Sequence, residues 1–382
     1  MTPEPSNELA AVRNVIARMI APDAERVDQT STFPGAAIRA LAEAGAGGLL
    51  MPVEYGGQAR PTREYAEAME LISAACGATA TVYMTQMHCA HPINLAGTPQ
   101  QVDQWIPALC SGAAIGAIAL TESDAGSDVA AMRTVATRHD DHYVVNGSKI
   151  FISNGDMADV IVLFATVDPV LGKDGITAFL VATENLQGFD AGRPMKKLGQ
   201  KGASTVELTF TDCRIPVDWR LGDEGAGYPL LLRSVLNSRI SASAQGVGFA
   251  QGAFDATVRH LMRDGLLSAQ RRDAQDLQFD LARIRSEIAA GRALVREVCD
   301  LVDSGAPEAA AEVSVAKLHC TALGVRVAAE CVALLGDDGD RCDLGVERRL
   351  RDAKITEIYD GTNQVQSMLI ARDIRISAAA VQ

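Results

Sequence analysis

The feature that most constrains the fold of this chain is a change of hydrophobic pattern at two points along the sequence. From Leu9 to about Cys110, apolar residues recur every three or four positions, which predicts amphipathic helices. From about Ala113 the pattern changes to short, β-rich apolar runs bounded by turn residues, and from about Gly227 long helical patterns return. The order α, β, α predicts packed units with a C-terminal helical bundle, and a single cleft between the units is the default binding site.

Two local signals make this outline more specific. Thr98, Pro99 and Gln101 form a capping-box pattern with proline at the first helical position, and they predict a helix that ends near Gly112. Asn146-Gly147 lies between two β-rich runs and predicts a hairpin turn at that point.

Composition narrows the class of protein. A length of 382 residues is enough for two or three packed units, and the net charge of -13 argues against nucleic acids and anionic membranes as general partners. No apolar run reaches membrane-spanning length, and the N-terminal MTPEPSNELA has neither a basic start nor an apolar core. We therefore expect a soluble, cytoplasmic protein. The eight cysteines are scattered without metal-ligand spacing, so we expect reduced structural thiols and no metal site.

The stretch from Leu350 to Arg372 contains the most informative break. Its apolar residues at helical spacing predict two buried helical segments, separated at Asp360-Gly361-Thr362. These apolar residues are Leu350, Ile355, Ile358, Val365, Met368 and Leu369. A carboxylate beside a glycine at such a junction can face a cavity and act as a base, since glycine lets a ligand approach the backbone. The local residues by themselves favour a simple turn that caps the next helix.

Several motifs carry a resemblance to a known family. They are LTESDAGSD at Leu120–Asp128, NGSK at Asn146–Lys149, FISN at Phe151–Asn154, KLG at Lys197–Gly199 and LRDAK at Leu350–Lys354. In order and spacing they resemble the acyl-CoA dehydrogenase family of flavoproteins, over nearly the whole chain. The resemblance implies an α+β multidomain fold with an N-terminal helical domain (1–116), a middle β-barrel (117–225) and a C-terminal four-helix bundle (226–382), as a homodimer or homotetramer.

The resemblance also implies a reaction. Family members bind FAD and dehydrogenate acyl thioesters: a carboxylate takes the α proton, and the β hydrogen leaves as hydride to the flavin. The electrons then pass to electron-transfer flavoprotein or another acceptor. Asp360 matches the position of the catalytic Glu in many members, but its side chain is about 1 Å shorter, a displacement large enough to affect the rate. Glu357, one turn earlier, is the nearest alternative base.

The remaining site residues are carried over from the resemblance. The residues expected to bind the cofactor are Leu120, Thr121, Gly126, Ser127, Phe151, Ser153, Thr362 and Gln364. Those expected to bind the substrate are Ser127, Arg239, Tyr83, Met87 and Gly361, and Met84 and His88 are further candidates for lining the acyl pocket. Read without the resemblance, Phe151 and the methionines are also compatible with core positions. His88 and His91 favour a polar or small acyl group.

The chain departs from the family in the half of the site that holds the ADP part of the cofactor. Asp264, Leu267 and Ser268 stand where the family has Arg-x-x-Phe-Gly, whose arginine reaches the diphosphate of a neighbouring subunit. An acidic residue there repels phosphate unless Arg263 or Arg271 substitutes.

A second departure also affects the half that holds the ADP part of the cofactor, and a third affects the part of the site expected to bind CoA. In Ala333–Gly339 a glutamine of the family has become Ala333 and a glycine has become Asp337. FAD remains the expected cofactor, with weaker binding or FMN as alternatives. Leu236 replaces the usual acidic partner of Arg239, which leaves both acyl-CoA and an acyl carrier protein thioester open as substrates.

Two other functions remain open from the sequence. One is a non-oxidative elimination or ring-closing reaction on an acyl thioester, because the carboxylate is shortened. The other is a flavin-poor binding protein, because the ADP contacts are altered.

Overall fold

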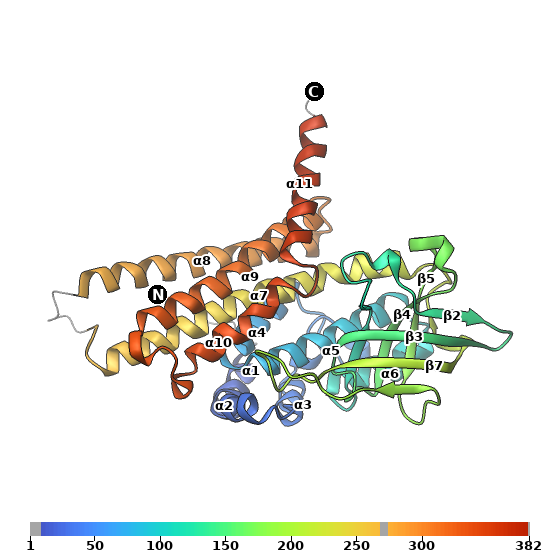
Figure 1. Ribbon diagram of the computed structural model, residues 1–382, viewed down its shortest axis with the longest axis horizontal. Coiled ribbons are helices and arrows are strands. Elements are labelled where there is room, and N and C mark those ends of the chain that lie inside the picture. The colour runs from blue at the N-terminus through green and yellow to red at the C-terminus, as the bar shows by residue number, and fades with distance from the viewer. Residues whose placement is uncertain (1–8, 268–273, 381–382) are drawn as a thin grey trace.

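The computed structural model describes residues 9–267 and 274–380, and it confirms the predicted order of helical, β-sheet and helical units (Figure 1). The sheet lies at one end of the molecule, and the long C-terminal helices extend to the other. The residues at which one unit gives way to the next stay a prediction.

The N-terminal unit is helical, and its longest helix is α5. The described helices are α1 (Ala10–Val15), α2 (Ala21–Thr30), α3 (Gly35–Glu43), α4 (Thr62–Ala75), α5 (Gly77–Ala96) and α6 (Pro99–Ser111), with a π-helical turn at Ile16–Ile20. Helix α5 is buried on nearly every side because it contacts α4, α6, α7 and the sheet. The predicted cap of α6 is confirmed: the Thr98 and Gln101 side chains each accept the other's backbone N–H, and the helix ends at a left-handed Gly112.

The middle unit is one largely antiparallel sheet. Its strands are β1 (Gly116–Ala119), β2 (Val135–Arg138), β3 (His142–Ser153), β4 (Val160–Thr166), β5 (Ile176–Ala182), β6 (Phe189–Ala191), β7 (Thr205–Pro216) and β8 (Arg220–Leu221). The strand order is β6-β7-β3-β2-β4-β5-β8, and β1 pairs with β4 in parallel. Strand β4 is buried on both faces, since Val160 and Val162 face the helices while Ile161 joins a second core enclosed by the sheet. The sheet therefore has its own core and a second face fixed to the helices.

The prediction of a hairpin at Asn146-Gly147 is wrong. Both residues lie inside the continuous strand β3, which pairs with β7 along its length. The register shifts by one residue here because β7 carries a bulge, with Asp212 in the left-handed region at φ 47°. Asn146 brackets that bulge, accepting from the Asp212 backbone N–H at 2.8 Å and donating to its carboxylate at 3.1 Å. Asn-Gly pairs commonly form turns, but in this strand Asn146 stabilises a bulge on β7.

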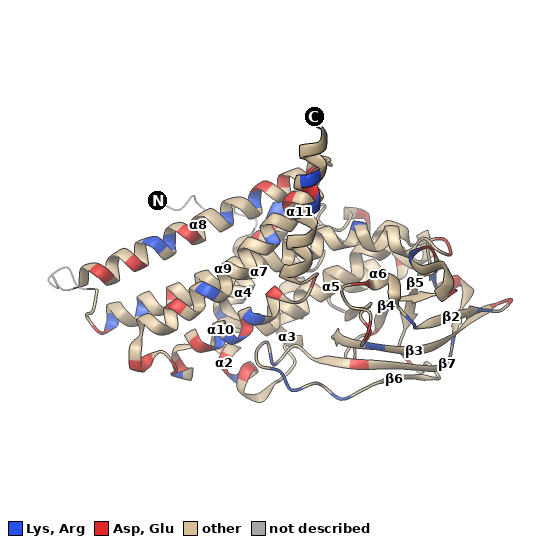
Figure 2. Cartoon of the chain, turned by 45° about the horizontal axis from the view of Figure 1, so that its top comes forward, with Lys and Arg blue, Asp and Glu red and all other residues tan. Residues whose placement is uncertain are grey.

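The C-terminal unit is helical from Gly227, as predicted, with breaks near Gly265 and Gly305. Its helices are α7 (Gly227–Arg263), α8 (Gln275–Ser304), α9 (Ala309–Leu334), α10 (Val346–Ala353) and α11 (Asn363–Ala380). Helices α7 and α9 approach closely where Gly246 and Gly324 face each other. Charged residues of both signs alternate along α8 and α9 (Figure 2), and Arg283 pairs there with Glu287 and Glu330.

The predicted break at Asp360-Gly361-Thr362 is confirmed, but the prediction that both flanking segments are buried is wrong. Helix α11 projects away from the body of the molecule (Figure 1). Ile355, Ile358 and Met368 are 38%, 52% and 72% exposed. The described chain does not cover this apolar face, because α11 leaves the bundle soon after the break.

Two further predictions concern membrane-spanning helices and the state of the cysteines. Among residues 9–267 and 274–380, no helix is long and apolar enough to cross a membrane. All eight cysteines are free thiols, as predicted; seven are buried, and Cys342 is exposed.

Candidate active site

The break before α11 is held in place from both sides. Asp360 has φ 55°, a left-handed conformation that aspartate tolerates better than most residues, and Gly361 follows at φ 86°. Tyr359 donates its hydroxyl to the side-chain oxygen of Gln245 on α7. On the other side, the Gln366 side chain donates to the Gly361 carbonyl at 2.9 Å, and Thr362 caps α11 by accepting the Val365 N–H at 3.2 Å. The loop that carries Asp360 is therefore fixed rather than free.

Two cations face Asp360 from the bundle. Lys317 on α9 is fully buried, and its ammonium group donates to the Asn363 side chain at 2.9 Å. Arg239 on α7 donates to the Ser314 hydroxyl at 3.3 Å, and its Nε is buried without a hydrogen-bond partner. Neither cation forms a direct ion pair with another described residue, so both act on Asp360 through space.

These surroundings bring the pKa of Asp360 close to neutral pH. Burial raises the pKa of Asp360 to about 7, while the charges of Lys317 and Arg239 and a hydrogen bond from Ser238 oppose the rise. Burial lowers the pKa of Lys317 to about 8, and the Asp360 charge opposes that shift. The Oδ2 atom of Asp360 is buried without a hydrogen-bond partner. A carboxylate with one free oxygen and a pKa near 7 is suited to general-base catalysis.

A buried polar network ties this loop to the other two units. Gln245 donates to the Thr81 hydroxyl on α5 at 3.5 Å, and Thr81 donates to Gln200 at 2.6 Å. The Gln200 backbone N–H and side chain both bond to Asp352 on α10. The KLG and LRDAK motifs thus meet at Gln200 and Asp352. They fix the base loop rather than supply chemistry themselves.

A polar cluster lies where α5 faces α7, beside the residue that bonds Asp360. Asn237 donates to the His91 ring at 3.2 Å, and Ser238 follows it on α7. The Asn237 side-chain oxygen and the His88 Nε2 are both buried without partners. Burial lowers the pKa of both histidines to about 4, so they are neutral near pH 7. This cluster therefore offers uncharged hydrogen-bonding groups near the base.

Tyr83, Met87 and Gly361 occupy different surroundings. Tyr83 is in the core, and its hydroxyl donates to the Ala46 carbonyl at 3.0 Å, so it is already engaged. Met87 is 1% exposed and packs in the same core. Gly361 lies beside Arg239: a Cβ added to it would stand 3.8 Å from the guanidinium Nη2. The structure thus brings Arg239 and Gly361 to the base.

The loop predicted to contact the flavin ring is anchored by a buried ion pair. The Lys149 ammonium group lies 2.7 Å from the Glu122 carboxylate, and it also donates to the Leu120 carbonyl at 3.0 Å. Glu122 in turn accepts the backbone N–H groups of Arg133 and Thr134 at 2.6 and 3.0 Å. Burial lowers the pKa of Lys149 to about 8. The ion pair and these hydrogen bonds therefore fix the loop.

Phe151 stands on the neighbouring strand in a strained conformation. Its φ is 61° and the residue is 64% exposed, although it lies within β3. A register shift between Lys149 and Ile152 leaves an extra residue on β3, and this bulge turns Phe151 outward. The Ile150 N–H donates to the Thr121 carbonyl at 2.8 Å, so the ring-contact loop and Phe151 are neighbours. An exposed aromatic in a strained backbone is typical of a functional position.

The other predicted cofactor residues are accessible. Gly126, Ser127 and Gln364 are exposed, and Leu120, Thr121, Ser153 and Thr362 are half-buried. Within residues 9–267 and 274–380, the hydroxyls of Thr121, Ser127 and Ser153 make no hydrogen bond, so they are available to a ligand. Glu357 bonds Lys354 at 2.6 Å on the helix surface and is poorly placed as a base.

The altered ADP half forms an ion cluster of its own. The His260 Nε2 lies 3.3 Å from Asp264 and 3.0 Å from Asp338, and Arg263 donates to the His260 Nδ1 at 2.8 Å. Since arginine only donates, Nε2 carries the proton and binds the carboxylates, which disfavours a metal ion there. Arg263 also bonds Asp264 at 3.3 Å, so it is already engaged. Ser268 and Arg271 lie outside the described residues.

Comparisons with known proteins decide the family. Three family models match in order: the acyl-CoA dehydrogenase N-terminal domain over residues 2–113, the middle domain over 117–213 and the C-terminal domain over 225–375. The chain belongs to the acyl-CoA dehydrogenase family. It is therefore an oxidoreductase of the type that acts on CH–CH groups.

Individual relatives agree with this assignment. The chain is 36% identical to a short-chain specific acyl-CoA dehydrogenase of Clostridium acetobutylicum, over 95% of this chain and 96% of the relative. Its structure matches butyryl-CoA dehydrogenase from Megasphaera elsdenii with a TM-score of 0.91 at 31% identity, covering 96% and 97% of the two chains. It also matches a prolyl acyl carrier protein oxidase with a TM-score of 0.89 at 27% identity, covering 97% and 99%.

Sequence reasoning missed Lys317 and the Glu122–Lys149 pair. Lys317 left a signal, because it is a lone charge inside the apolar run VSVAKLHCTALGV. A lysine at an apolar helical position is unusual, because lysine is almost never fully buried without a partner. Glu122 and Lys149 lie 27 positions apart, so their pairing depends on the sheet register, which the sequence did not supply.

Proposed function

We propose that this protein catalyses the flavin-dependent α,β-dehydrogenation of a short acyl thioester, with Asp360 as the base that removes the α proton. The observation that carries the proposal is the buried, unpartnered carboxylate oxygen of Asp360, which faces two unpaired cations at the helix break. Buried polar atoms normally have partners, so an isolated carboxylate oxygen supports a ligand-binding role.

FAD is the cofactor we propose, and the ring half of the site fits a flavin. The free hydroxyls of Thr121 and Ser153 suit the polar edge of a flat ring, and the exposed Phe151 suits one of its faces. Bound flavin supplies the acceptor for the β hydrogen. In the ADP half Asp264 is paired with Arg263 and Asp338 with Arg341, which reduces the repulsion of a diphosphate. The family's arginine contact is still lacking there.

The bundle residues prepare Asp360 to accept a proton. Lys317 and Arg239 favour its ionised form, and burial opposes it, so the carboxylate is basic enough to take a proton near pH 7. Arg239, beside Gly361, also supplies a positive charge for the anionic part of the substrate or the enolate-like charge that develops. The left-handed backbone and the Tyr359 anchor keep the short side chain aimed at one point.

The cluster of His88, His91 and Asn237 favours a small acyl group with an uncharged polar substituent. The side-chain oxygen of Asn237 is buried and has no hydrogen-bond donor, so a plain alkyl chain leaves it unsatisfied. The neutral histidines offer no charge to a carboxylate substituent. Relatives named for short-chain and butyryl thioesters support a short chain, and the carrier protein oxidase keeps a carrier-bound substrate open beside acyl-CoA.

The partners we propose follow from the family and the surface. An electron-transfer flavoprotein or a similar acceptor removes the electrons after each turnover. The exposed apolar side chains of Met368, Ile374 and Ile376 on the projecting α11 support a homodimer or homotetramer in which a second copy covers them. A cytoplasmic location stays a prediction.

The test is an anaerobic titration of the purified protein. In one sample the cofactor is released and identified. Butyryl-CoA, 4-hydroxybutyryl-CoA and the corresponding pantetheine thioesters are added to separate samples that keep the cofactor bound. The proposal predicts FAD and loss of visible flavin absorbance with at least one thioester. Product formation without flavin reduction would indicate elimination or ring closure, and a protein that binds no flavin would overturn the proposal.

A further inference from the structure

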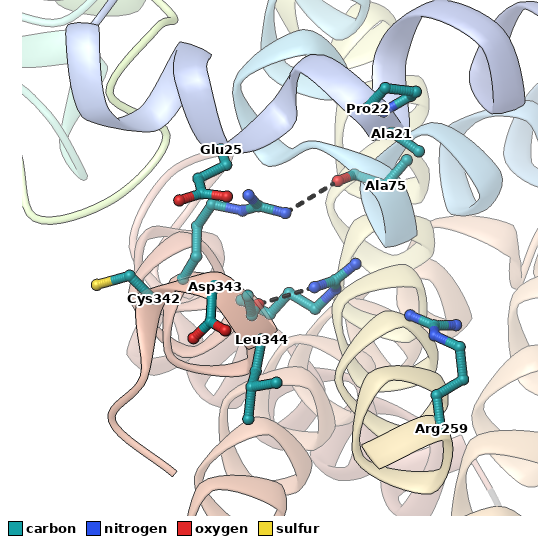
Figure 3. A pocket seen from close by; sticks show the side chains of 11 residues that line it. Ala21, Pro22, Glu25, Ala75, Arg259, Cys342, Asp343 and Leu344 are labelled. Atoms are coloured by element: carbon teal, nitrogen blue, oxygen red, sulfur yellow. Dashed lines mark hydrogen bonds between the residues drawn. The ribbon is translucent and has the colours of Figure 1, made fainter. Parts of the chain in front are cut away.

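A pocket of about 220 Å³ lies between α2, α7 and the start of α10, and it contains no residue predicted to bind cofactor or substrate (Figure 3). Its walls include Arg259 from α7 and Arg348 and Arg349 from α10. Sites for drug-sized ligands have about 300–1,000 Å³, so this pocket suits a smaller molecule. None of Asp360, Lys317 and Arg239 lines it, so it is separate from the active site.

The three arginines have no acidic partners. Arg348 is 8% exposed, and its Nε is buried without a hydrogen-bond partner. Arg348 and Arg349 donate to carbonyl oxygens at the end of α4, the latter at 2.8 and 3.0 Å. Neither residue, nor Arg259, forms an ion pair within the part of the chain that the structure describes. Capping α4 therefore accounts for part of their hydrogen bonding. Asp352, also on α10, acts on Arg348 and Arg349 only from beyond ion-pair distance.

The arginines also repel one another. Burial lowers the pKa of Arg349 to about 10, and the charges of Arg348 and Arg259 lower it further, while the charges of Asp352 and Asp255 oppose the shift. Two acidic residues, Glu25 and Asp343, line the pocket. Asp343 is already held by Arg341 at 2.8 Å, so its charge is largely compensated. The pocket is left with an excess of positive charge.

Gly345 marks the point where two of these groups converge. A Cβ added to Gly345 would stand 3.0 Å from the Arg349 Nη1 and 3.4 Å from the Arg348 Nη2. The two guanidinium groups therefore lie close together beside the Gly345 backbone, where the Arg349 Nη1 donates to the Gly345 carbonyl at 2.7 Å. One oxyanion in the pocket can face both groups. The residue is glycine with φ 66°, so no side chain occupies the position.

We propose that this pocket binds a phosphate group, either as the free ion or as the terminal group of a small molecule. Paired guanidinium groups are the strongest protein donors for oxyanions, and the anion would remove the repulsion between them. Arg348 and Arg349 face the phosphate from α10, and Arg259 faces it from α7.

The test is isothermal titration calorimetry of flavin-loaded protein with inorganic phosphate in a phosphate-free buffer. We expect one saturable site whose affinity falls as the salt concentration rises. Arg259→Gln should weaken binding by at least about tenfold, because it removes one charge-assisted contact. Arg259 is exposed and makes no hydrogen bond with a described residue, so this variant should fold normally. Arg296→Gln, which removes an exposed charge on α8, is the matched control and should bind as wild type does.

A second variant tests the geometry without altering charge. Gly345→Ala places a methyl group 3.0 Å from the Arg349 Nη1 and 3.4 Å from the Arg348 Nη2, so both guanidinium groups must shift. It should weaken phosphate binding by at least about tenfold. Its thermal melting curve shows whether the left-handed backbone tolerates alanine. The proposal is overturned if wild type shows no saturable phosphate binding. It is also overturned if Arg259→Gln and Gly345→Ala bind phosphate as tightly as wild type does, since the ion would then occupy another site.

Discussion

Replacing Lys317 with methionine tests how the bundle sets the basicity of Asp360. Lys317 is fully buried, and methionine has a similar length without the charge. The variant removes the positive charge that lowers the pKa of Asp360 more strongly, while Arg239 and Ser238 remain. Asn363 keeps one of its two hydrogen bonds, from Thr321 at 3.0 Å, so the loop should stay in place.

The expected size follows from the charges around the carboxylate. A nearby opposite charge lowers the pKa of a carboxyl group by about 1–3 units. Without Lys317 the pKa of Asp360 should therefore rise from about 7 by about one unit or more. Below its pKa, a base loses a factor of ten in its ionised fraction per pH unit. At pH 6 the variant should have about tenfold lower kcat/KM than wild type.

The assay is the pH profile of kcat/KM between pH 5.5 and 9.5, with thioester and an artificial electron acceptor. The acid limb of Lys317→Met should move to higher pH, and Lys317→Arg, which keeps the charge, should stay close to wild type. A uniform loss of kcat with an unchanged inflection would mean that Lys317 only positions the loop. An unchanged profile and rate would refute the electrostatic role entirely.

Three further predictions concern stability and selectivity. The folded pKa of Asp360, about 7, lies above its ordinary 3.8, so the ionised form destabilises the fold increasingly as pH rises through that window. Asp360→Asn should gain stability over wild type by at most about 1.4 kcal/mol per pH unit there, and urea melts at pH 4 and 8 should show no gain at the lower pH. Lys149→Met leaves Glu122 buried and unpaired and should cost about 3–5 kcal/mol, largely recovered in the double variant with Glu122→Gln; equal stability of single and double variants would contradict this. His88→Leu should lower the kcat/KM ratio of 4-hydroxybutyryl-CoA to butyryl-CoA by at least about tenfold, and an unchanged ratio would exclude His88 from acyl recognition.

The sequence predicted the parts of the fold that depend on periodicity and on local caps. Three of these features depend only on neighbouring residues, so the sequence predicts them. They are the change from helical to strand spacing at about Ala113, the Thr98 capping box and the break at Asp360. The turn predicted at Asn146-Gly147 failed because a bulge on β7, more than 60 residues away, uses the same residues.

The active site was predictable only in part, for a related reason. Motif positions indicated Asp360 and the ring-contact loop, and the structure places Arg239 beside Gly361. The charges that tune Asp360 come from α9 and α7, whose packing brings Lys317 and Arg239 to one point. The exposed apolar face of α11 was mistaken for a buried one because spacing reveals an apolar face and not what covers it.

The measurement that tests the central claim most directly is rapid mixing of the flavin-loaded protein with its best thioester under anaerobic conditions. Wild type, Asp360→Asn and the matched surface variant Glu357→Gln are compared by the rate at which flavin absorbance is lost. The account predicts that Asp360→Asn binds the thioester but reduces flavin at least about 10²-fold more slowly, while Glu357→Gln stays near wild type. Flavin reduction at the wild-type rate in Asp360→Asn would show that another group removes the α proton.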